Sequence, residues 1–100
     1  MSNKHLPVQE KVNKLVSLYE KNLLQEALIE AKSLVNQHPN VPVIYNIYGI
    51  INIALGNWKQ SATCFSKAIK LKTDYAEAHH NLGIALDNLG QLEEAIQSYT

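Results

Sequence analysis

The sequence predicts an all-α protein, an α-solenoid in which antiparallel helix pairs are stacked side by side. Apolar residues recur every three or four positions through most of the chain, which is the spacing of amphipathic helices. Helix-breaking residues separate these segments. The same residue types also recur 34 positions apart, as Gly49 and Gly83 do, and as Gly56 and Gly90 do. A period of this length, made of two helices and a turn, is typical of a repeat array in which each unit packs on its neighbours.

The stretch from Val41 to Trp58 contains no charged residue, although 18% of the chain is charged. Its apolar residues fall on every side of a helical projection, so as a helix it must contact neighbours all round. Gly49 and the absence of alternation argue against a strand. The stretch is also too short and too rich in asparagine for a membrane span, which needs about 20 apolar residues. We therefore expect a buried helix at the middle of the stack.

The first helix pair is predicted in residues 8–41. Residues 1–7 form a leader that ends where Pro7 can occupy a first helical turn. An amphipathic helix runs from Val8 to Asn22, and Asn22 tolerates the left-handed conformation that ends helices. A second apolar stripe follows and stops at residues 38–40, which include a proline.

The later helices are delimited by glycines. The uncharged helix is expected to end at Gly56, and a fourth helix follows it. Asp74 and Glu77 have capping-box spacing and open a fifth helix. Gly90 is predicted to end the fifth helix, with a sixth beginning at Gln91 and still running at the last residue.

Two of the repeat units carry a known pattern. The second unit contains Tyr45, Tyr48, Gly49, Gly56, Ser61, Phe65 and Ala68. The third unit reads AEAHHNLGIALDNLGQLEEAIQSY and contains Leu82, Gly83, Leu86, Gly90, Ala95 and Tyr99. On these residues the chain resembles the tetratricopeptide repeat family, whose pattern is W-x2-L-G-x2-Y followed by A-x3-F, A and P. The first unit matches only at Ala27 and Pro39-Asn40, with Leu15 in place of the glycine.

The resemblance implies a right-handed solenoid of about two and a half to three repeats. The leader covers residues 1–7, and a degenerate first repeat covers residues 8–41. The second repeat covers residues 42–75. The third, residues 76–100, is truncated in its second helix.

The resemblance also implies a function without catalytic chemistry, in which the first helix of each repeat lines a concave groove. Carried over position by position, the groove residues are Val12, Asn13, Val16, Asn46, Ile47, Ile50, Ile53, His80, Asn81, Ile84 and Asp87. We expect the apolar members to contact a peptide or protein partner and the asparagines to bond its backbone. The alternative is that neighbouring helices cover several of the apolar residues.

The kind of partner is narrowed by one comparison within the family. Chaperone-binding members hold a terminal carboxylate with Lys, Asn and Arg side chains at five groove positions. Those positions carry Val12, Val16, Ile47, Glu77 and Asn81 here. Only Asn81 is a polar donor, and Glu77 would repel a carboxylate, so capture of a chaperone tail is not expected.

A second reading of the same resemblance points to a larger enzyme. Asn13 and Asn81 stand where O-linked N-acetylglucosamine transferases carry a ladder of asparagines, although Ile47 interrupts it. The third repeat also resembles the repeats that precede bacterial glycosyltransferase or sulfotransferase domains. The chain could therefore be the substrate-recruiting region of such an enzyme, with the catalytic domain after residue 100 and no enzymatic activity of its own.

Composition excludes several other classes. The formal net charge is zero and the chain has no arginine, so nucleic-acid binding is not expected. The adjacent His79 and His80 would point about 100° apart on a helix, so we expect no metal and no cofactor. The first residues lack the apolar core of a signal peptide, which indicates the cytoplasm. Cys64 is predicted to be a tolerant surface position because its equivalent is Ser98, and Tyr45 and Tyr48 are predicted to be packing residues.

The end of the sequence suggests self-association. Because the chain stops inside the predicted sixth helix, we expect it to be an N-terminal fragment of a larger protein. An apolar stripe on that helix would then lack its neighbour. We expect homo-oligomers to form through this end, by stacking or by exchange of helices, with Leu92, Ala95, Ile96 and Tyr99 as the contacting residues.

Overall fold

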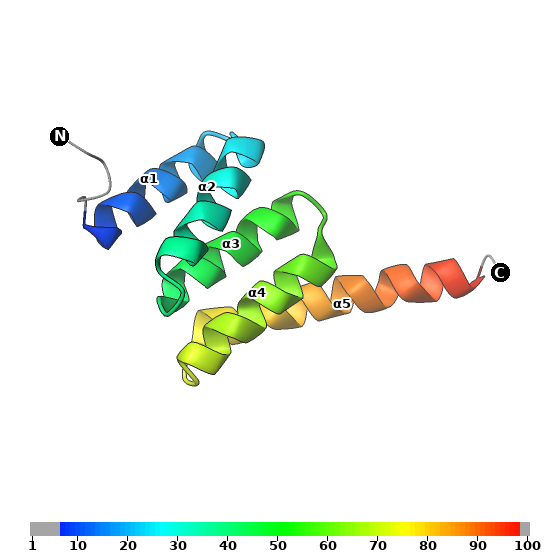
Figure 1. Ribbon diagram of the computed structural model, residues 1–100. Helices are drawn as coiled ribbons and strands as arrows, with labels where there is room; N and C mark the ends of the chain where they lie inside the picture. Colours follow the sequence, from blue (N-terminus) through cyan, green and yellow to red (C-terminus); the bar gives the residue numbers. More distant parts are fainter. Residues whose placement is uncertain (1–6, 99–100) are drawn as a thin grey trace.

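The computed structural model describes residues 7–98, so most of the predicted leader and Tyr99 lie outside the described residues. Within that part the chain forms only helices (Figure 1). They are α1 (Val8–Glu20), α2 (Leu24–Gln37), α3 (Pro42–Ala54), α4 (Trp58–Leu71) and α5 (Ala76–Ser98).

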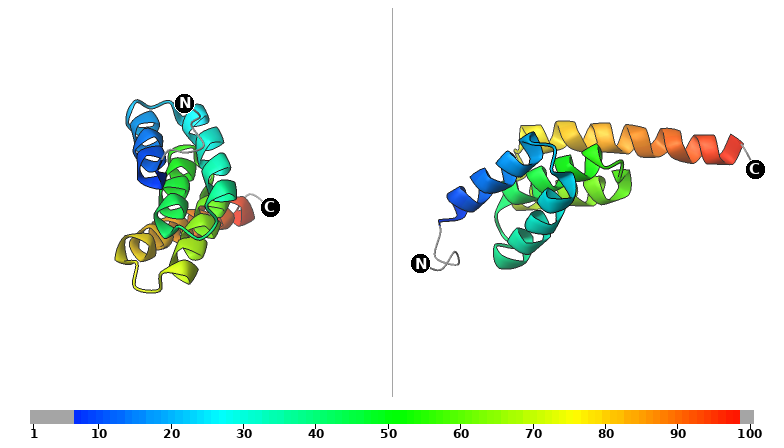
Figure 2. Two further views of the ribbon diagram at one scale, coloured as in Figure 1. Left: turned by 60° about the vertical axis from the view of Figure 1, so that its left-hand side comes forward. Right: turned by 90° about the horizontal axis from the view of Figure 1, so that it is seen from above.

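The helices form two antiparallel pairs and one long single helix. α1 pairs with α2, and α3 pairs with α4, while α2 also packs on α3. α5 packs along α4 with its first half and then extends beyond the other helices (Figure 2). The extents of the molecule are therefore unequal, at 57 × 29 × 20 Å.

The turns inside both pairs are built alike. Asn22 has a φ of 60° and Gly56 a φ of 74°, and this left-handed conformation is favourable only for glycine and, at lower cost, asparagine. The residue after each one donates its backbone N–H back over the turn. The Leu23 amide bonds the Leu18 carbonyl at 3.0 Å, and the Asn57 amide bonds the Asn52 carbonyl at 2.8 Å. The predicted ends of the first and third helices are thus confirmed.

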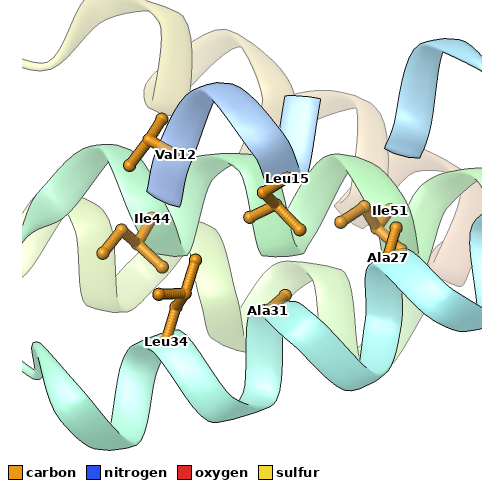
Figure 3. Packing of buried hydrophobic residues seen from close by; sticks show 7 residues of the cluster. All are labelled: Val12, Leu15, Ala27, Ala31, Leu34, Ile44 and Ile51. Carbon is orange, nitrogen blue, oxygen red and sulfur yellow. The ribbon is translucent and has the colours of Figure 1, made fainter. Parts of the chain in front are cut away.

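The core lies where α1, α2 and α3 meet. It consists of Val12 and Leu15 from α1, Ala27, Ala31 and Leu34 from α2, and Ile44 and Ile51 from α3 (Figure 3). The alanines of α2 leave room for the larger side chains of its two neighbours. α3 is buried on several sides, as its lack of charge predicted.

Within the α3–α4 pair, Gly49 allows a close approach. A Cβ at this position would lie 2.5 Å from Cε1 of Phe65, so only glycine fits. Phe65 is fully buried. This confirms, for the second repeat, the prediction that a small residue stands where the two helices of a pair meet.

The predicted break at Gly90 is wrong, because α5 continues through it to Ser98. The turn after α3 has a side-chain hydrogen bond that is missing after α5, although the turn after α1 forms with Leu18 and Leu23 at the same two positions. Asn57 Nδ2 donates to Asn52 Oδ1 at 3.2 Å across the turn after α3. The equivalent residues in the third repeat are Leu86 and Gln91, which cannot form this bond. Gly90 permits a turn but does not require one, and its cost inside a helix is only about 1 kcal/mol. The third helix pair is therefore not formed.

Candidate functional site

The predicted groove residues lie on the first helices of the three repeats, α1, α3 and α5. α3 is in contact with both of the others, so the three helices present one continuous side of the molecule. We call this side the first-helix face. It is defined by Asn13, Val16, Ile47, Ile50, Ile53, His80, Asn81, Ile84 and Asp87.

Two predicted groove residues are not part of this face. Val12 is 5% exposed and belongs to the core between the first three helices. Asn46 is 2% exposed, beneath the junction of α3 and α5. Neither side chain is available to a partner. Neighbouring helices therefore cover Val12, which is the alternative given above for the apolar groove residues.

The remaining apolar members are accessible to different degrees. Val16 and Ile47 are half-buried because each also packs against the core. Ile50 and Ile53 are half-buried too, whereas Ile84 is 38% exposed. Apolar surface therefore extends from the centre of α3 to α5. A partner could cover it without displacing the core.

Asn46 and Asn81 come together although 35 positions separate them. Asn81 Nδ2 donates to Asn46 Oδ1 at 3.2 Å and so joins α5 to α3. Asn46 also hydrogen-bonds Tyr75, just before α5. Burial raises the pKa of Tyr75, as does the nearby Glu77, while this bond acts in the opposite direction. The role of Asn46 is thus to fix the junction of two repeats, and the predicted backbone contact falls to Asn13 and Asn81.

The polar residues of the face sit at its two ends. On α1, Asn13 is exposed and accepts a hydrogen bond from Gln9 Nε2 at 3.0 Å. On α5, His80 and Asp87 are exposed. The centre contributed by α3 carries no charge. The exposed Glu77 adds a negative charge at the start of α5.

A pocket that the sequence did not predict lies between α3 and α4. Its volume is about 350 Å³, and its lining residues are Tyr45, Tyr48, Gln60, Thr63, Cys64 and Lys67. Tyr45 and Tyr48 are therefore half-buried wall residues, and Tyr45 donates its hydroxyl to the Pro39 carbonyl at 3.0 Å. Nothing in the sequence marks Gln60, Thr63 and Lys67 of α4 as pocket residues, since polar side chains on an amphipathic helix normally face solvent.

The prediction that Cys64 is a surface position is wrong. The residue is only 7% exposed, and Asn52 Nδ2 lies 3.8 Å from its Sγ. Desolvation raises the pKa of the Cys64 thiol to about 11, and the Asn52 hydrogen bond offsets only part of that effect. A thiol with a raised pKa is a poor nucleophile, so this residue has the character of a packing group.

Residues 7–98 offer little for other kinds of site. No group of three His, Cys, Asp or Glu side chains gathers there to hold a metal ion. His79 Nε2 instead lies 2.9 Å from the Thr73 carbonyl oxygen. None of the helices in this range has the length and hydropathy required to cross a bilayer.

The comparisons with known proteins bear on this arrangement. A family model described as TPR repeat matches residues 49–90. The fold is similar to the structure of the first TPR of Spaghetti (RPAP3) bound to HSP90 peptide SRMEEVD, with a TM-score of 0.78 and 21% identity. That likeness covers 95% of this chain and 78% of the other. The chain has the all-α fold of a tetratricopeptide repeat solenoid, with about two and a half repeats.

One curated relative of this chain is Protein FlbA of Caulobacter vibrioides, which is 29% identical over 84 residues. The match covers 84% of this chain but only 14% of FlbA. A similar stretch therefore lies within a much longer protein. The family-model match runs across the boundary between the second and third repeats, through α4 and the first half of α5.

Proposed function

We propose that this tetratricopeptide repeat chain is a protein-interaction module that binds a peptide or protein segment on its first-helix face. The supporting observation is the pair Ile50 and Ile84. They stand at the same repeat position on α3 and α5, and both are accessible on a face to which α3 contributes no charge. Apolar contact area flanked by asparagines suits an extended or helical segment.

The chemistry of the face favours an apolar segment over an acidic one. The Spaghetti repeats are bound to the HSP90 peptide SRMEEVD, which has three acids. Here the five clamp positions offer no lysine or arginine. Val12 is buried, Val16 and Ile47 pack on the core, and the exposed Glu77 is negative. Like charges disfavour the acidic peptide.

The experiment is a selection of peptides on the purified chain, followed by calorimetry on the selected peptide. Ile50→Lys and Ile84→Lys should each weaken binding by about tenfold or more, which corresponds to about 1.4 kcal/mol. Ile29→Lys is the matched control, because Ile29 is 69% exposed on α2 and lies off this face. SRMEEVD should not bind. Unchanged affinity in both face variants would place the partner elsewhere.

A second candidate function is the recruitment of substrate for a glycosyltransferase or sulfotransferase domain that lies after residue 100. Asn13 on α1 and Asn81 on α5 support it, because both are accessible on the first-helix face. The FlbA match within a much longer protein agrees with such a parent. A chain extended past residue 100 should then transfer sugar or sulfonate to the selected peptide, and the isolated repeats should not. We place this module in the cytoplasm, in accord with its free and buried Cys64.

A further inference from the structure

The side of α5 that faces the preceding repeat is covered as fully as the same side of α3. Ala78 and Ala85 are completely buried, and so are Ile44 and Ile51, which stand 34 positions earlier. α5 therefore packs on the second repeat in the way that α3 packs on the first. The stacking of each repeat on the one before it therefore extends as far as α5.

The side of α5 that would face a second helix is uncovered. In α3 this side carries Gly49 and Asn52, which α4 buries. In α5 it carries Gly83, which has no neighbouring atom within 4 Å of an ideal Cβ, and Leu86, which is 52% exposed. We call Gly83 and Leu86 the acceptor face. Because leucine replaces asparagine there, this face is more apolar than its covered counterpart.

The segment that corresponds to the first half of α4 is present but points away from the acceptor face. Residues 91–98 stand 34 positions after residues 57–64 and form the outer half of α5. Leu92 is 50% exposed and Ile96 is 57% exposed. Ala95 corresponds to Ser61, which is fully buried in the α3–α4 pair. We call Leu92, Ala95 and Ile96 the donor segment.

One continuous helix cannot bring its own donor segment onto its own acceptor face. Ala95 stands nine positions after Leu86, which is about 14 Å along the axis at 1.5 Å per residue. The same nine residues turn about 900° around the axis, so the two side chains lie on opposite sides of α5.

We propose that the donor segment of one copy packs on the acceptor face of a second copy, in the place that α4 takes over Gly49 and Asn52. Gly83 leaves room for a close approach, and Leu86 meets the apolar side chains of the incoming helix. Because each copy carries its acceptor face and donor segment on opposite sides of α5, two copies cannot exchange helices reciprocally. The contact is heterologous, so copies add head to tail and more than two can associate.

Sedimentation of variants tests this contact. For the unaltered chain the average mass should rise with concentration and pass twice the chain mass of 11.2 kDa. Leu86→Glu removes the acceptor face and Ile96→Glu removes the donor segment, so each alone should be monomeric. An equimolar mixture should form a one-to-one complex and nothing larger. Ile29→Glu on α2 is the control and should associate like the unaltered chain, since Ile29 is exposed away from α5.

A disulfide experiment separates the proposed contact from closure within one chain. After oxidation, Leu86→Cys combined with Ala95→Cys should give a ladder of covalently linked copies, because a disulfide needs Cα atoms about 4.4–6.8 Å apart. Buried Cys64 should not take part. A disulfide within the monomer would show that α5 folds back at Gly90, and it would overturn the proposal. So would a mass that stays monomeric at every concentration, or one that stops at a dimer. Circular dichroism checks that each variant keeps its helices.

Discussion

The ring of Phe65 fills the space beside Gly49 in which any other residue would place its Cβ. Three ring atoms lie 2.5 to 2.8 Å from that position. This contact sets the spacing of α3 and α4, and it holds together the one helix pair that links the core to α5.

Gly49→Ala should therefore lower the free energy of unfolding by about 1–3 kcal/mol, as overpacking does in other cores. Gly83→Ala is the matched control at the equivalent position of the third repeat. It meets no atom within 4 Å and should stabilise α5 by about 0.5–1 kcal/mol. Urea denaturation at low protein concentration measures both. Equal effects in the two variants would contradict the difference in packing.

Asn52 supports the turn after α3 from a buried position. Its amide donates to the Tyr48 carbonyl at 3.1 Å, and its Oδ1 accepts from Asn57. Asn52→Leu, which copies the third repeat, should cost about 1–3 kcal/mol because Asn57 loses its partner beneath the turn.

Asn88→Leu is the comparison for this variant, since Asn88 only bonds the Ile84 carbonyl at 2.8 Å within α5 and supports no turn. Its effect should stay within about 0.5 kcal/mol. Thermal unfolding followed by circular dichroism distinguishes the two. A stable Asn52→Leu chain would mean that Gly56 alone is sufficient for the turn.

Burial of the Cys64 thiol should make stability depend on pH. Its pKa is raised from an ordinary 9.0 to about 11, so the folded chain holds the proton more tightly than the unfolded chain. The stabilisation is complete below pH 9 and is lost as the pH rises from 9 to 11. A shift of this size corresponds to about 2–3 kcal/mol.

Cys64→Ser should remove this part of the pH dependence, and unfolding measured in small pH steps above 8 tests it. Tyr48 and Tyr75 also have raised pKa values, so loss of stability should persist at higher pH in the variant. An unchanged curve between pH 9 and 11 would show that the thiol is not the titrating group.

Replacing a core isoleucine should lower the free energy of unfolding far more than replacing a surface isoleucine. Ile44 is completely buried between α2 and α3, whereas Ile29 is 69% exposed. Ile44→Ala should cost about 2–5 kcal/mol through the cavity it leaves, and Ile29→Ala should cost less than about 0.5 kcal/mol. The denaturation midpoints of the two variants measure this difference. A small loss of stability in Ile44→Ala would argue against the packing shown in Figure 3.

Much of the fold could be predicted from the sequence because its signals are local. The helix ends at Asn22 and Gly56 follow from which residues tolerate a positive φ. The buried α3 follows from its lack of charge, and the approach of α3 to α4 follows from small residues repeated every 34 positions. The first-helix face stays a prediction, because its residues were assigned from the repeat positions that the tetratricopeptide resemblance implies.

The tertiary structure alone decided which residues on those sides are covered, because burial depends on neighbours that sequence spacing does not place. Val12 and Asn46 are enclosed by adjacent helices, and Cys64 lies under α3 although its counterpart is a serine. Gly90 was predicted to end a helix but lies inside α5. A glycine only lowers the cost of a bend, and the chain bends where the following helix packs back on the preceding one, as α2 does on α1 and α4 does on α3.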